Sequence, residues 1–91
     1  MRKEIVINGN DITSTINFHQ EIARMLSFPG YYDNTLDSLL DCLNTYIDPK
    51  LTIHWTSHNT SKAYLGHEFD QIIEVFQMIK GYHPEFEYHL N

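Results

Sequence analysis

The sequence predicts an α/β domain of two layers, in which helices pack on one face of a three-stranded parallel sheet. Three observations support this fold class. The predicted elements follow the order strand, helix, helix, strand, helix, strand. Strands separated by helices are joined by right-handed crossovers into a parallel sheet. The last two strands alternate apolar and polar residues, which indicates that only one face of the sheet is buried. A length of 91 residues suits a single domain, residues 1–91.

The first half of the chain contributes a strand and a helix. Residues 2–8 are predicted to form the strand, because β-branched side chains fill positions 5–7. A turn at residues 9–11 follows. The helix begins among residues 13–17, where several capping signals compete, and ends near Ser27, before Pro29-Gly30 opens a loop. Its apolar face is formed by Phe18, Ile22, Met25 and Leu26.

The second half supplies the remaining elements. Strands are recognised by alternation of apolar and polar residues, and helices by an apolar face at helical spacing. A second helix is capped by Asn34 or Thr35 and runs to Ile47, and a strand follows at 51–55. The segment 56–66 is polar, with a short helical turn at 62–65. A helix at 69–79 is ended by Gly81 and Pro84, and the last strand covers 86–90.

Composition restricts the partner and the compartment. Twelve acidic and six basic residues give a net charge of −6, which opposes binding to nucleic acid and favours a basic protein. The single cysteine, Cys42, excludes an internal disulfide. With neither a signal peptide nor an apolar run long enough to span a membrane, the expected compartment is the cytoplasm.

The segment from Tyr31 to Ile47 concentrates aromatic and acidic residues on a short surface. At about 100° per residue, one face of its helix is apolar, with Leu36, Leu39, Leu40, Leu43 and Ile47. A second stripe runs along the flank of the first, with Asp37, Asp41, Asn44 and Asp48. Asp37 and Asp41 are four residues apart and repel each other, which helix stability alone would not favour. The stripe is therefore either a solvated acidic face or a surface for a positively charged partner.

The adjacent Tyr31 and Tyr32 lie in the loop before this helix. They could pack against the core, or they could anchor an interface, where a large rigid ring with a polar tip is favoured. Because neighbouring loop residues cannot easily both enter one core, we expect at least one ring to be exposed.

The sequence gives little support for a metal site, a reactive cysteine or a catalytic site. The six histidines are scattered, and His19 is expected off the main apolar face and on the surface, so no metal site is predicted. Cys42 lies on neither stripe and is expected to be a structural thiol. Asp37 and Asp41 share one flank and cannot face each other across a cleft as a glycosidase pair does. No glycine-rich phosphate loop is present, and we predict neither catalytic residues nor a cofactor.

The segment FPGYYDNTLDSLLDCLNTYI, residues 28–47, resembles the core motif of the barstar family, intracellular inhibitors of the secreted ribonuclease barnase. The similarity extends without gaps from the first strand into the last helix. It includes IVING at 5–9, HQ at 19–20, Pro29-Tyr31-Tyr32, LD at 36–37, DCL at 41–43, Trp55, Ser61-Lys62 and Val75-Phe76. The shared order and spacing of these motifs, each weak alone, carry the resemblance. It implies a barstar-like fold, in agreement with the fold class predicted above.

The resemblance also implies a function. Such a protein would block the active site of a small, basic, guanyl-type ribonuclease in a one-to-one complex, using the second helix and the loop before it. Asp41 matches the acid that enters the phosphate-binding site of the nuclease, and Asp37 matches a second acid that meets basic residues. Tyr31 and Tyr32 match loop tyrosines of the interface. The alternative is a barstar-like immunity module for a different basic protein.

The sequence departs from the family pattern around this site. Asp33 stands in place of glycine, Thr35 in place of asparagine, and Met78 in place of an interface glutamate. Leu40 and Tyr46 replace tryptophans. These differences predict a related nuclease with a different surface. The predicted partner-binding residues are Tyr31, Tyr32, Asp33, Thr35, Asp37, Leu40, Asp41, Asn44 and Tyr46.

Overall fold

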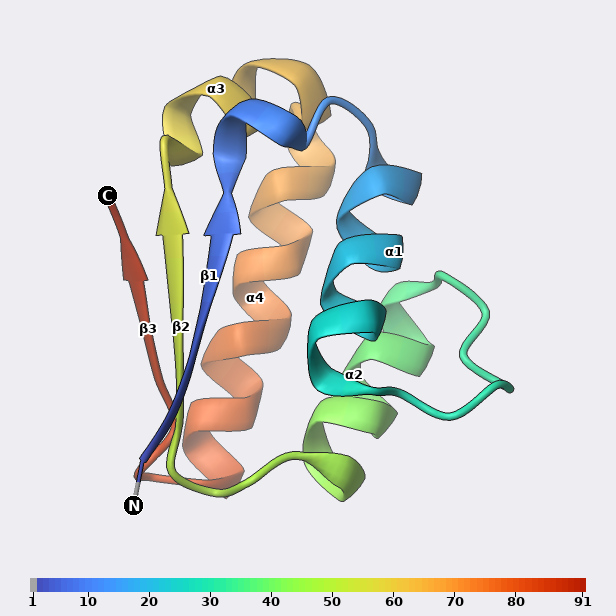
Figure 1. The fold of residues 1–91 in the computed structure, drawn as a ribbon, viewed down its shortest axis with the longest axis vertical. Helices are drawn as coiled ribbons and strands as arrows, with labels where there is room; N and C mark the ends of the chain where they lie inside the picture. The colour runs from blue at the N-terminus through green and yellow to red at the C-terminus, as the bar shows by residue number, and fades with distance from the viewer. Residues whose placement is uncertain (1) are drawn as a thin grey trace.

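A parallel sheet of three strands forms one layer of the structure, a computed structural model that describes residues 2–91 (Figure 1). The strands are β1 (Lys3–Asn8), β2 (Leu51–Thr56) and β3 (Glu87–Leu90), in the spatial order β1-β2-β3. Both neighbouring pairs are parallel, so the predicted sheet is confirmed. Met1, which the predicted domain 1–91 includes, lies outside the described residues.

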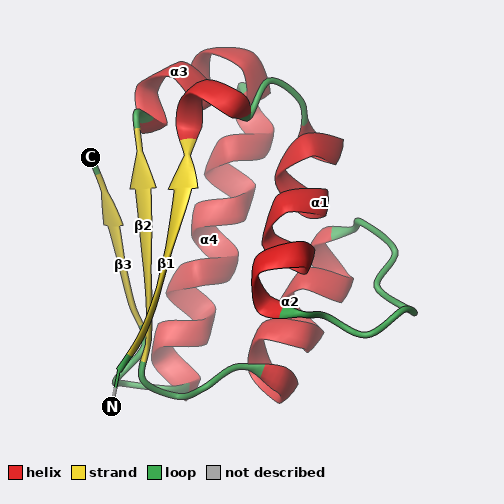
Figure 2. Cartoon of the chain, in the orientation of Figure 1, coloured by secondary structure: helices red, strands yellow, loops and turns green. Residues whose placement is uncertain are grey.

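Helices cover one face of this sheet (Figure 2). They are α1 (Thr15–Leu26), α2 (Leu36–Tyr46) and α4 (His67–Tyr82), with α3 (His58–Leu65) and the 3-10 helix η1 (Gly9–Asp11) at the ends of β2 and β1. The opposite face of the sheet is open, and Val6, in the middle of the edge strand β1, is 55% exposed. The two-layer α/β architecture is therefore confirmed. Within residues 2–91, no helix is both long and apolar enough to cross a membrane.

The core lies between the sheet and the helices, with Trp55 at its centre. Trp55 is fully buried, and its ring stacks on that of Phe18 with 5.1 Å between centroids. Its Nε1–H donates to Ser61 Oγ at 2.9 Å, and the Ser61 hydroxyl donates to the Gly9 carbonyl at 2.9 Å. A buried indole N–H needs such a partner, so this chain of hydrogen bonds joins β2, α3 and η1.

Three elements differ from the expectation. The helix α4 spans His67–Tyr82 and continues through Gly81, which was expected to end it. Residues 58–65 form a complete helix rather than a short turn at 62–65, and residues 9–11 form a 3-10 helix rather than a plain turn. The helix α3 buries only Ser61 and Leu65, so its sequence lacks the apolar face that would have revealed it. It forms because it packs against η1. A Cβ on Gly9 would lie 2.3 Å from the carbonyl oxygens of Thr56 and Ser57, so the approach requires glycine.

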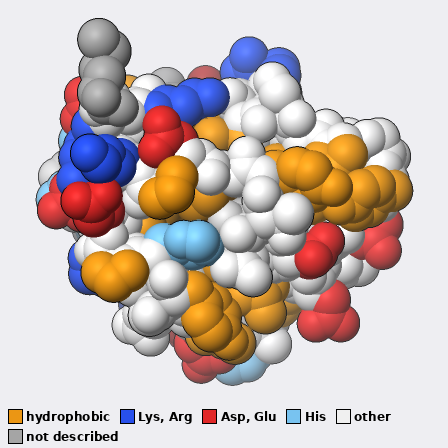
Figure 3. All heavy atoms as spheres, turned by 90° about the horizontal axis from the view of Figure 1, so that it is seen from below, with side chains coloured by type: hydrophobic (Ala, Val, Ile, Leu, Met, Phe, Trp, Pro, Cys, Tyr) orange, Lys and Arg blue, Asp and Glu red, His pale blue; other side chains and the backbone are white. Residues whose placement is uncertain are grey.

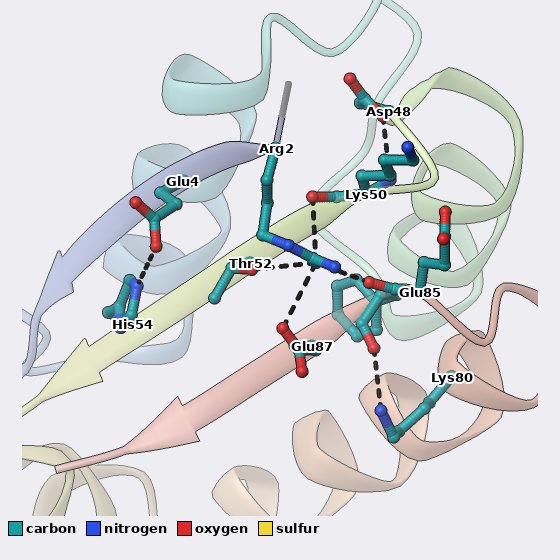
Figure 4. A network of polar contacts seen from close by, with 10 residues as sticks. Arg2, Glu4, Asp48, Lys50, Thr52, His54, Lys80, Glu85 and Glu87 are labelled. Atoms are coloured by element: carbon teal, nitrogen blue, oxygen red, sulfur yellow. Dashed lines mark hydrogen bonds and ion pairs between the residues drawn. The ribbon is translucent and has the colours of Figure 1, made fainter.

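The open face of the sheet is crossed by Arg2 (Figure 4). Its guanidinium donates to the carbonyl oxygens of Lys50 at 3.2 Å and Glu85 at 2.7 Å, and to Thr52 Oγ1 at 3.2 Å. It also forms an ion pair with Glu87 at 3.3 Å. These bonds join the start of β1 to β2 and to the segment that enters β3.

Candidate protein-binding site

The site is built on α2, whose first turn is fixed by Thr35. The Thr35 hydroxyl accepts a hydrogen bond from the Ser38 N–H at 3.2 Å and donates to Asp33 Oδ1 at 2.6 Å. Thr35 is therefore the N-cap, which settles the choice between Asn34 and Thr35. Hydrogen bonds from Thr35 and Ser38 hold the pKa of Asp33 below its usual range, so this carboxylate stays charged at the start of the helix.

The two predicted stripes of α2 are present. Leu39 and Leu43 are completely buried, and three partly buried residues pack beside them: Leu36, Leu40 and Ile47. Leu40 thus belongs mainly to the core. All four residues of the polar stripe are exposed: Asp37, Asp41, Asn44 and Asp48. Among residues 2–91, no ion pair involves Asp37 or Asp41, so both carboxylates are available to an external cation.

The two adjacent tyrosines separate. Tyr31 is 56% exposed, whereas Tyr32 is partly buried and packs against the core. The expectation that at least one ring is exposed is confirmed. The Tyr32 hydroxyl is hydrogen-bonded to His19 Nδ1, and its ring contacts those of His19 and Phe28. Tyr32 therefore anchors the loop of residues 27–35, here called the tyrosine loop, and leaves Tyr31 outside.

Tyr31 reaches across the outer surface of α2 and meets two other predicted residues. Its hydroxyl lies 2.8 Å from the Tyr46 hydroxyl and 3.5 Å from Asp41 Oδ2. The shorter contact is a hydrogen bond that Tyr31 donates to Tyr46, and Asp41 Oδ2, which can only accept, lies at the outer limit of hydrogen-bond distance from the same hydroxyl. The bond with Tyr46 is the main reason that the pKa of Tyr31 lies well above its usual value. Tyr46 is itself 50% exposed, so it belongs to the surface.

His19 corrects the sequence prediction, because it is buried rather than on the surface. Only 1% of the residue is exposed, and burial lowers the pKa of its imidazole. On α1 it lies about 100° from Phe18, next to Leu26 at about 80°, and the tyrosine loop covers this edge of the apolar face. The contact with Tyr32 is tertiary, so the spacing within α1 could not reveal it.

Cys42 is completely buried, although it lies outside the apolar stripe of α2. It neighbours Tyr31 and Tyr32, so the tyrosine loop covers this flank of the helix as well. Burial raises the pKa of the thiol, which keeps it protonated and unreactive, as a structural cysteine should be.

Asn44 is tied to α4 by a residue that the sequence did not single out. His83 Nε2 lies 3.0 Å from Asn44 Oδ1 and 3.2 Å from the Asn44 carbonyl oxygen. His83 also caps the end of α4, because its backbone N–H donates to the Ile79 carbonyl. This histidine fixes the C-terminal ends of α2 and α4 beside each other. In the part of the chain that the structure describes, no three side chains of His, Cys, Asp or Glu gather to hold a metal ion.

The structure thus brings Tyr31, Asp41 and Tyr46 together and places Asp37 and Asn44 beside them. It assigns Tyr32 and Leu40 mainly to packing, and it uses Asp33 and Thr35 at the helix start. Comparison with known proteins identifies the family. A family model described as Barstar (barnase inhibitor) matches residues 2–90. A Bacillus subtilis (strain 168) protein named "Putative ribonuclease inhibitor YrdF" is 38% identical over 77 residues, which cover 85% of this chain and 84% of that protein. The chain therefore belongs to the barstar family.

Proposed function

We propose that this protein inhibits a small, basic ribonuclease of the guanyl-type, barnase-like class, by covering the active site of the enzyme in a one-to-one complex. Membership in a family described as barnase inhibitors supports an inhibitory role, as does the name of the Bacillus subtilis relative. A protein of this family binds its target and is not an enzyme. We further propose that the protein acts in the cytoplasm as a monomer.

The observation that carries the proposal is the pair of exposed, unpaired carboxylates on α2. A ribonuclease must bind the phosphates of RNA, so its active site is cationic. Asp37 and Asp41 are exposed on the same flank of one helix, and no ion pair within residues 2–91 neutralises either of them. Two carboxylates held one helical turn apart can take the place of phosphates among basic side chains.

The tyrosines next to this pair suit the rest of the interface. Tyr31 and Tyr46 expose 56% and 50% of their surface, and their hydroxyl oxygens lie 2.8 Å apart within hydrogen-bond distance. Fixed aromatic rings lose little conformational entropy on binding and bury a large area. We therefore assign Tyr31 and Tyr46 to the contact that surrounds the charged centre.

The test is calorimetric titration of the protein into a panel of small guanyl-type ribonucleases in catalytically inactive form, with RNA cleavage by the active enzymes followed in parallel. One-to-one binding with loss of cleavage is the expected result. Binding without loss of cleavage would favour a module for another basic surface, and no binding to any member of the panel would refute the proposal.

Two matched variants then locate the site. Asp41→Asn should weaken the complex by about 3–5 kcal/mol, because basic groups buried at the centre would lose their partner. Asp70→Asn is the control, since it removes the same charge from an exposed position in the first turn of α4. Equal losses of less than about 0.5 kcal/mol, the size of an exposed ion pair, would remove Asp41 from the interface.

A further inference from the structure

We propose that His54 and His89 form a binding site for a divalent transition-metal ion on the open face of the sheet, and that the bound ion links the edge strand β3 to β2. The two imidazoles come from neighbouring strands and lie beside each other on that face. The site is separate from the proposed ribonuclease interface, because α2 belongs to the layer of helices on the other side of the sheet (Figure 2).

The register of the sheet brings the two imidazoles together. His54 of β2 is paired with His89 of β3, and its sequence neighbours Ile53 and Trp55 are buried in the core. Because side chains alternate along a strand, His54 is turned to the open face with His89 beside it. The ring centroids lie 5.4 Å apart, with an angle of 22° between the ring planes. An ion with bonds of about 2.0–2.1 Å needs its two nitrogens about 3–4 Å apart, which a modest tilt of the two rings toward each other provides.

Glu4 orients His54 for a metal ion (Figure 4). Its Oε1 lies 3.0 Å from His54 Nε2. Because a carboxylate only accepts, Nε2 carries the hydrogen of this bond, and the lone pair of the neutral ring is on Nδ1. A histidine that binds a metal ion commonly donates its other N–H to a carboxylate, which fixes the tautomer and makes the coordinating nitrogen more basic. Glu4 of β1 is in the position to do this for His54, and β3 with His89 lies on the other side of β2.

The charges on this face admit a cation. Arg2, which crosses the face, forms an ion pair with Glu87 at 3.3 Å, so its positive charge is balanced. Figure 3 shows basic and acidic side chains next to each other at the end of the molecule where the strands begin. The side chain of Glu4 is 61% exposed and adds a negative charge next to His54. The net charge of −6 also attracts cations to the protein as a whole.

Two imidazoles select the class of ion. Imidazole suits Zn²⁺, Cu²⁺ and Ni²⁺, whereas Mg²⁺ and Ca²⁺ prefer oxygen ligands. Within residues 2–91, no third side chain of His, Cys, Asp or Glu completes a group that could hold a metal ion, so water fills the remaining coordination positions. Cu²⁺ should bind more tightly than Ni²⁺ or Zn²⁺, in the usual order for divalent ions. The ion would add a link to β3, a strand of only four residues.

The test is calorimetric titration of Zn²⁺ into the full chain, with Mg²⁺ as the control ion. We expect one Zn²⁺ per protein and no binding of Mg²⁺. His54→Gln and His89→Gln should each weaken Zn²⁺ binding at least about tenfold, and Glu4→Ala should weaken it by about tenfold as well. His67→Gln is the matched control, because it removes an exposed histidine at the start of α4. If no Zn²⁺ binds, or if His67→Gln weakens binding as much as His89→Gln does, the site is refuted. Thermal unfolding without metal verifies that each variant is folded.

Two further measurements show whether one ion contacts both strands. Pulsed electron paramagnetic resonance of bound Cu²⁺ should detect two imidazole ligands in the unaltered protein and one in His89→Gln. At a Zn²⁺ concentration about 100 times the dissociation constant, hydrogen exchange of the β3 amides should slow by up to about 100-fold, and His89→Gln should abolish this effect. A single imidazole ligand in the unaltered protein, or exchange of β3 that does not respond to Zn²⁺, would refute the link between β2 and β3.

Discussion

At the scale of single residues, the site depends on hydroxyl groups as much as on carboxylates. Tyr31 is held over α2 by Tyr46 and lies beside Asp41, and Tyr32 fixes the tyrosine loop from below through His19. Under the proposed function, the partner would meet side chains that are already held in place by these bonds, which would lower the entropic cost of association. Two substitutions test these bonds separately.

Tyr46→Phe removes the hydroxyl that Tyr31 contacts and keeps the aromatic ring. We expect the pKa of Tyr31 to fall toward its usual value, because the bond with Tyr46 is the main cause of its rise. We also expect the complex with a target ribonuclease to weaken by about 1 kcal/mol, the net contribution of one hydrogen bond. NMR titration of the tyrosine ring carbons and calorimetry measure the two effects. Tyr64→Phe, at the exposed tyrosine of α3, should alter neither.

His19 makes stability depend on pH. Burial lowers the pKa of His19 in the folded protein, an effect that Glu68 and Asp33 oppose in part. The unfolded chain then binds a proton more readily than the folded one. The stabilisation that neutral His19 contributes is fully present above a pH of about 6.5, the usual pKa of histidine. It is lost as the pH falls from there toward the lowered pKa of His19 in the folded protein.

Urea unfolding between about pH 7.5 and pH 5 measures this loss. His19→Asn is the comparison, because its amide can reach the position of Nδ1 but does not titrate. The unaltered protein should lose more stability over this interval than the variant loses. Parallel pH profiles would show that His19 does not carry the dependence.

At the scale of elements, η1 lies very close to the end of β2 and to Ser57, the N-cap of α3. A Cβ on Gly9 would lie 2.3 Å from two backbone oxygens, whereas a Cβ on Gly81 would meet nothing within 4 Å. Gly9→Ala should therefore destabilise the protein by about 2–3 kcal/mol, the cost of overpacking at a backbone contact. Gly81→Ala, inside α4, should be neutral or stabilising by up to about 1 kcal/mol. Equal midpoints of urea unfolding for the two variants would contradict this account.

The elements also show where sequence reasoning succeeds. The stripes of α2 were predictable, because leucines at helical spacing specify a buried face and so place Asp37 and Asp41 on its flank. The helix α3 was not, since it buries only Ser61 and Leu65. His19 was misplaced, whereas Cys42 is the structural thiol that was expected. His19 lies at the edge of an apolar face, and the tyrosine loop that covers it is positioned by tertiary contacts rather than by local spacing.

At the scale of the whole molecule, the net charge of −6 controls how fast a basic partner arrives. The association rate constant should fall steeply as salt rises from about 0.01 M to about 1 M, because ions screen the attraction between the two proteins. The dissociation rate should change much less. Stopped-flow mixing with an inactive ribonuclease measures both rates. An association rate that does not depend on salt would show that the acidic surface does not steer the encounter.

The open face of the sheet gives the molecule a side suited to chemical labelling. Val6 is 55% exposed there, on a strand that lies across the molecule from α2 (Figure 1). The single cysteine of the chain, Cys42, is completely buried. A thiol-reactive fluorophore should therefore react with a Val6→Cys variant at the new position alone, and a dye on that face would leave α2 and α4 unobstructed. The fluorescence of the labelled protein would then change when the partner binds, and the dye would not cover the binding surface.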